Sequence, residues 1–151
     1  MQTPDTNTAT GLPAKPPMSD YTLRARTRMP HARAVASVRE ALQEQGFGVL
    51  TEIDVRRVMK DKLGLDVAAE IILGACRPEL AHRALSSAPS LAALLPCNVV
   101  VRETGEGSTV VEAVDPAVMS QLEGHPEVAS VAWEARRRLR AALDRVSQEV
   151  A

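Results

Sequence analysis

The spacing of apolar residues along the chain switches between alternation and a helical repeat, and each switch predicts a new element. Residues 21–29 alternate apolar residues with arginines, which is typical of a half-buried strand. Residues 30–45 repeat apolar residues at helical spacing, and Gly46 follows where a helix C-cap is expected. Further on, two strand patterns at 97–102 and 109–114 are joined by a glycine-containing linker and predict a hairpin.

The second strand is expected over residues 47–53, where period two returns. One of its faces would carry Phe47, Val49, Thr51 and Ile53. Glu52 would then point to the other face, either into solvent, which we favour, or into a pocket where a carboxylate acts as a general acid or base. Asp54 offers an N-cap to the next helix, and Gly64 suits the end of that helix.

The third strand and the third helix meet at a cysteine. Residues 69–76 form a short apolar run of strand length that ends in Cys76, and Pro78 suits the first position of a helix through Leu85. Pro96 cannot donate to a sheet ladder, so it marks a bulge, an edge or the true start of the next strand.

The last part of the chain contains the longest helical repeat. Asp115 and Pro116 suit the start of a short helix, after which residues 126–150 carry one apolar stripe. That stripe consists of Val128, Val131, Ala132, Ala135, Leu139, Ala142, Leu143 and Val146. The element order β-α-β-α-β-α-β-β-α-α predicts an α+β fold with two layers: a mixed, largely antiparallel sheet with helices mainly on one face.

Composition adds that this is a small domain with an aliphatic core. The chain has 151 residues, of which 45% are hydrophobic and 25% charged, as expected of one globular domain over residues 20–151. Residues 1–19 are rich in Pro and Thr and are predicted to be a disordered tail. Only three residues are aromatic, so a site that stacks bases is disfavoured. No apolar run of membrane-spanning length and no signal peptide is present, so we expect a cytoplasmic protein with no membrane partner.

Charge gives no argument for a nucleic-acid partner, because 18 basic residues balance 19 acidic ones. The distribution is uneven, however. Residues 20–33 carry a net charge of +3, whereas residues 102–127 carry −5. This layout favours self-association or the steering of a charged ligand, although scattered surface charge is the commoner explanation.

Three segments in this order resemble the bacterial family called Domain of Unknown Function 302. They are GFGVLTEIDV (46–55), ILGACRPELAHRAL (72–85) and LLPCNVVV (94–101), and the likeness extends over about residues 20–147. The resemblance implies a compact α+β domain and a homodimer, but no reaction, substrate or cofactor. The sequence departs from the family at Arg77, where relatives commonly have Asn, a better helix N-cap.

Cys76 is the residue with the clearest chemical potential. It lies just before an expected helix start and is followed by Arg77, and both features are expected to lower the pKa of its thiol. It is therefore a candidate nucleophile, redox thiol or soft-metal ligand. The commoner alternative is a small buried hydrophobe at a strand end.

Cys97 and Asn98 follow Pro96 and are candidate ligand-binding residues at the start of the next strand. Cys97 lies near Cys76 only if their two strands are antiparallel, and the helix between them also permits a parallel arrangement. His82 is a weaker candidate ligand or base, since an exposed helical histidine is the better interpretation.

Three functions stay open on the sequence. The first, which we favour, is a noncatalytic homodimeric domain that binds or senses a small ligand or a soft metal through Cys76 and Cys97. The second is a thiol-dependent enzyme with Cys76 as its reactive thiol. The third is a purely structural or interaction domain. No complete catalytic set and no phosphate-binding motif is present to decide among them.

Overall fold

The structure, a computed structural model, describes residues 21–105 and 107–149. The predicted disordered tail at residues 1–19 lies outside the described residues. In chain order the elements are β1 (Thr22–Thr27), α2 (His31–Glu44), β2 (Gly48–Asp54), α3 (Val55–Leu63), β3 (Glu70–Cys76), α4 (Pro78–Ser87), the 3-10 helix η1 (Pro89–Leu94), β4 (Cys97–Glu103), β5 (Thr109–Val114), α5 (Ala117–Leu122) and α6 (Pro126–Gln148). This is the predicted order, with η1 added. No helix within the described ranges is both long and apolar enough to cross a membrane.

The five strands form one sheet in the order β1-β5-β4-β3-β2, and every neighbouring pair is antiparallel. The prediction of an α+β fold with a largely antiparallel sheet is therefore confirmed. The arrangement of β3 and β4, which the sequence left open, is antiparallel. Consequently the end of β3 and the start of β4 lie at the same edge of the sheet, with Ala75 directly opposite Cys97.

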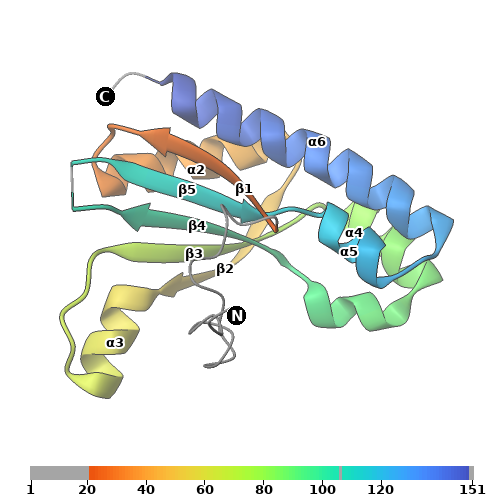
Figure 1. Cartoon of the computed structure of the whole chain (residues 1–151), viewed down its shortest axis with the longest axis horizontal. Coiled ribbons are helices and arrows are strands. Elements are labelled where there is room, and N and C mark those ends of the chain that lie inside the picture. Colours follow the sequence, from red (N-terminus) through yellow and green to blue (C-terminus); the bar gives the residue numbers. More distant parts are fainter. Residues whose placement is uncertain (1–20, 106, 150–151) are drawn as a thin grey trace, which may run out of the picture.

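Helices α2 and α6 cover one face of the sheet, and α3 lies on the side away from α6 (Figure 1). The residues of α6 that face inward are those of the predicted apolar stripe. The core is aliphatic as expected. Phe47 is the one buried aromatic residue in the described chain, whereas Tyr21 and Trp133 are exposed.

The buried residues form two clusters that share α6. The larger cluster fills the space between the sheet, α2 and the second half of α6. The smaller one joins α4, η1 and α5 to the first half of α6, and it contains Leu80, Ala84, Ala88, Leu91, Met119, Val128, Val131 and Ala135. Leu95, between η1 and β4, packs against both clusters. Figure 1 shows the same division, with α6 running from α4 and α5 at one end to α2 and β1 at the other.

The predicted faces of β2 are wrong in part, because the strand contains a bulge. The pairing register with β3 shifts between Val49 and Thr51, and one extra residue reverses the alternation beyond it. Glu52 therefore lies opposite the buried Leu73 and faces the helices, where it forms an ion pair of 2.9 Å with Arg39 of α2. Thr51 and Ile53 face the open side of the sheet.

Gly74 marks the place where the three family-like segments touch. It lies on β3 between Thr51 of β2 and Asn98 of β4. A Cβ at this position would overlap Thr51 Oγ1 and would lie 2.8 Å from Pro96 Cγ. The close approach of the neighbouring side chains therefore requires a glycine here.

Candidate functional site

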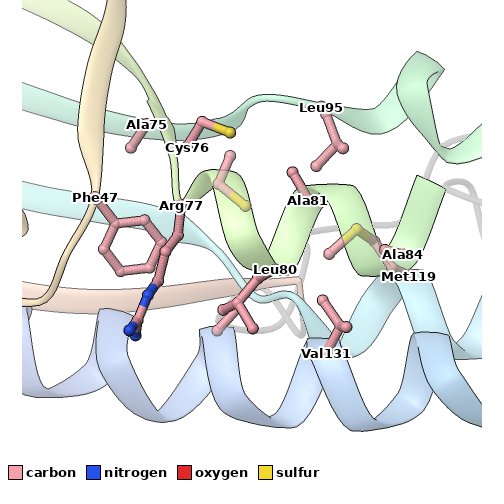
Figure 2. A pocket seen from close by; sticks show the side chains of 12 residues that line it. Phe47, Ala75, Cys76, Arg77, Leu80, Ala81, Ala84, Leu95, Met119 and Val131 are labelled. Atoms are coloured by element: carbon pink, nitrogen blue, oxygen red, sulfur yellow. The ribbon is translucent and has the colours of Figure 1, made fainter. Parts of the chain in front are cut away.

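A small pocket opens where the two clusters of buried residues meet. Its volume is about 30 Å³, which is room for one or two groups the size of a water molecule. Twelve residues line it, and Figure 2 shows their side chains: Phe47, Ala75, Cys76, Arg77, Leu80, Ala81, Ala84, Leu95, Cys97, Met119, Val131 and Ala135. The pocket thus combines residues of β3, β4, α4, α5 and α6, which the fold brings together from distant parts of the chain.

Sulfur is the chemically distinctive element of this pocket. Cys97 is buried at the start of β4, and Cys76 is half-buried where β3 ends. Met119 is buried and reaches the pocket from α5 (Figure 2). Three sulfur atoms therefore line one cavity whose other walls are apolar, except for Arg77.

Arg77 holds its guanidinium in a poorly paired environment. The side chain is 20% exposed, and its Nε and Nη1 atoms are buried without a hydrogen-bond acceptor among the described residues. Its contacts with carboxylates are long, at 3.8 Å to Glu79 and 4.0 Å to Glu134 of α6. It also packs closely on Gly46, where a Cβ would lie 3.1 Å from Nε. In Figure 2 the guanidinium accordingly points away from Cys76 and towards α6.

Both thiols have raised pKa values, contrary to the expectation for Cys76. Burial raises the pKa of Cys97 to about 11, and the neighbouring Cys76 adds to the effect. Burial and the carboxylate of Glu79 raise the pKa of Cys76. The expected lowering fails because burial disfavours the thiolate and because the first turn of α4 places Glu79 near the thiol, while the Arg77 guanidinium turns towards α6. Both cysteines are therefore thiols at neutral pH.

The other candidate residues lie away from the pocket. Asn98 is exposed on the open face of the sheet, in a shallow groove beside Tyr21 and Val100. Glu52 is paired with Arg39, and His82 is exposed on α4. The structure thus brings together Cys76, Arg77 and Cys97 and separates them from Asn98, Glu52 and His82.

Sequence reasoning did not find Met119 or the apolar wall that faces the cysteines. Met119 carried no signal beyond being one apolar residue of a short helix, and only the packing of α5 against α6 brings it to the pocket. In the part of the chain that the structure describes, no three His, Cys, Asp or Glu residues gather in a way that could hold a metal ion.

Together, the fold and the pocket define a small antiparallel α+β domain with a sulfur-lined cavity. The chain belongs to the family described as domain of unknown function DUF302, whose model matches residues 22–146. Among solved structures, an uncharacterised conserved DUF302 protein from Bacillus stearothermophilus is 27% identical, with a TM-score of 0.77 over 84% of this chain and 98% of that chain. No curated protein matches the chain. The resemblance inferred from the three segments is confirmed.

Proposed function

We propose that this chain is a noncatalytic domain that binds or senses a small ligand in the pocket between residues 74–78 and 96–98. The observation that carries the proposal is the lining itself. It contains two thiols, one thioether, one guanidinium and apolar side chains, and no imidazole, carboxylate or hydroxyl. A pocket of this composition offers a place to bind but no general base to activate a nucleophile.

The pocket limits the size and the chemistry of the ligand. A volume of about 30 Å³ accepts a single ion or a group of a few heavy atoms. Apolar walls favour a dehydrated ligand, and the sulfur atoms favour a soft metal or a thiol-reactive group. The raised pKa values of both thiols are the reason why we favour binding over a thiol-dependent enzyme.

A pocket-filling substitution tests this function. Silver(I), methanethiol and methanol are added in turn to the full chain, and the methyl resonances of Leu80, Leu95 and Val131 are followed by NMR. We expect at least one probe to shift these resonances and to raise the melting temperature. Ala81→Val should abolish the response, because Ala81 lines the pocket and the added methyl groups occupy it.

Ala129→Val is the matched control, since it places the same side chain at an exposed position of α6. It should leave the response unchanged. If no probe shifts the pocket resonances of the wild type, or if Ala81→Val responds as the wild type does, the pocket is not a ligand site. The purely structural interpretation would then take its place.

We also propose that the domain acts as a homodimer, with a second copy covering β2 and α3. Five of the exposed large hydrophobic residues lie between positions 50 and 65: Leu50, Ile53, Val58, Leu63 and Leu65. None of the residues of α3 is buried, although the helix is amphipathic. Four of its nine residues are basic and one is acidic, which complements the net charge of −5 over residues 102–127 of a second copy.

A further inference from the structure

Three soft donor atoms converge on the pocket from three different elements. Cys97 begins β4 directly opposite Ala75, so Cys76 is the next residue along the neighbouring strand. Met119 approaches from α5, on the other side of the cavity (Figure 2). Their place in one pocket is a property of the fold, because more than twenty positions separate each from the next in the sequence.

The three sulfur donors also select for the kind of metal ion. Thiolate and thioether sulfur bind soft ions such as Cu(I), whereas hard cations require carboxylate, carbonyl or water oxygens. The lining offers no oxygen-bearing side chain. We propose that Cys76, Cys97 and Met119 form a site for one soft monovalent metal ion, of the Cu(I) class. This proposal rests on the proposed function, in which the pocket is the ligand site, and it names the ligand.

The size of the cavity agrees with a bare ion. A volume of about 30 Å³ has room for one bare ion in the pocket that the three sulfur-containing side chains line, but not for an ion that keeps its full hydration shell. On binding, two S–H bonds break and both protons pass to solvent. Two metal–thiolate bonds and one metal–thioether bond form, and the oxidation state of the metal does not change.

The bound unit carries one negative charge in an apolar pocket, so the surrounding charges matter. Arg77 is the cation of the lining, and two of its nitrogen atoms have no acceptor in the described structure. In the structure the Arg77 guanidinium points away from Cys76 and Glu79 lies near that thiol, so the surrounding charges do not offset this charge. The preference for a soft monovalent ion therefore rests on the sulfur ligands.

Zinc provides a contrast that distinguishes this site from a general thiol site. Structural zinc requires four ligands, and no cluster of His, Cys, Asp and Glu in the described ranges supplies them. Cu(I) accepts a two- or three-coordinate sulfur environment. We therefore expect the chain to bind Cu(I) much more tightly than Zn(II).

The experiment is an anaerobic titration of the reduced full chain with Cu(I), in competition with the chelator bathocuproine disulfonate. We expect one ion per chain, release of two protons, and an X-ray absorption spectrum with a shell of sulfur neighbours only. Cys76→Ser and Cys97→Ser should each weaken the apparent affinity by about 100-fold, and Met119→Leu by about tenfold. Met29→Leu is the matched control, because Met29 is fully buried but lies outside the pocket.

The titration and the spectrum can each contradict the metal site. Absence of saturable one-to-one binding, affinity unchanged in Cys76→Ser, or nitrogen and oxygen neighbours in the spectrum would overturn the metal site. If Cu(I) fails while methanethiol or methanol still perturbs the pocket, the metal site is wrong and the proposed function stands. Circular dichroism checks the fold of each variant. If Cys97→Ser does not fold, the variants Cys76→Ser and Met119→Leu still test the metal site. Cys76 is only half-buried, and leucine has nearly the volume of methionine, so both variants are expected to fold.

Discussion

Cys76 and Cys97 are surrounded in a way that suppresses ionisation. Cys97 lies within the larger buried cluster, and Cys76 shares its pocket with apolar side chains and lies near Glu79. A thiol in this environment packs as a small hydrophobe until a ligand that binds sulfur displaces its proton. Both thiols should therefore react slowly with electrophiles at neutral pH, whereas a soft metal that displaces the proton would still bind.

Alkylation kinetics measure this property directly. In a Cys97→Ala variant, the rate at which iodoacetamide modifies Cys76 should rise with pH and should still be rising at pH 9. The reason is that the pKa of Cys76 is raised from an ordinary value of 9.0, and only the thiolate reacts. In the reciprocal Cys76→Ala variant, Cys97 should react more slowly still, because burial raises its pKa and also restricts access of the reagent. A rate that levels off below pH 8 for Cys76 would contradict the structure and favour the thiol-dependent enzyme.

At the scale of elements, the contact of β2, β3 and β4 around Gly74 fixes how the three strands fit. Gly74→Ala should lower the free energy of unfolding by about 1–3 kcal/mol, since the added methyl overlaps Thr51 and crowds Pro96. Urea denaturation monitored by circular dichroism measures the change. Gly105→Ala is the control, because nothing lies within 4 Å of a Cβ at that position. Adding Thr51→Ala to Gly74→Ala should restore part of the stability, and an equal loss in both glycine variants would show that crowding is not the cause.

The elements that the sequence predicted well are those whose pattern is long and regular. The stripe of α6 repeats over about five turns, so its buried residues could be named from spacing alone. β2 was harder, because its bulge leaves only two adjacent apolar residues, Val49 and Leu50, as a trace in the pattern. The antiparallel pairing of β3 with β4 could not be predicted, since α4 between them fits either direction.

For the candidate site, too, local patterns were predictable and contacts between distant segments were not. Cys76 and Arg77 were found from their place before a helix, and Cys97 from its place after a proline. Met119 and the wall formed by α6 depend on contacts between distant segments, which one sequence does not reveal. The direction of the Cys76 pKa shift was missed for a related reason. It depends on how far the fold buries Cys76 and on the nearby carboxylate of Glu79, and the position of Cys76 before a helix reveals neither.

For the whole molecule, the exposed apolar residues of β2 and α3 predict association of two copies. Ile53→Lys should raise the dissociation constant of the dimer at least tenfold, because it places a charge where apolar surface would be buried. Sedimentation equilibrium over a range of concentrations measures it. Trp133→Lys is the control, since Trp133 is also exposed but lies on α6, on the other side of the sheet. A wild-type chain that stays monomeric at millimolar concentration would exclude the dimer.

The position of α6 has a consequence for how a bound ligand would act on the molecule. With 23 residues the helix is about 35 Å long, and it is the main element that the two clusters share. A ligand in the pocket ties α4 and α5 to β3 and β4 directly, so that local opening of this end requires the ligand to leave. Occupancy would then change how often this end of the domain opens, and it could do so with little change in the average shape.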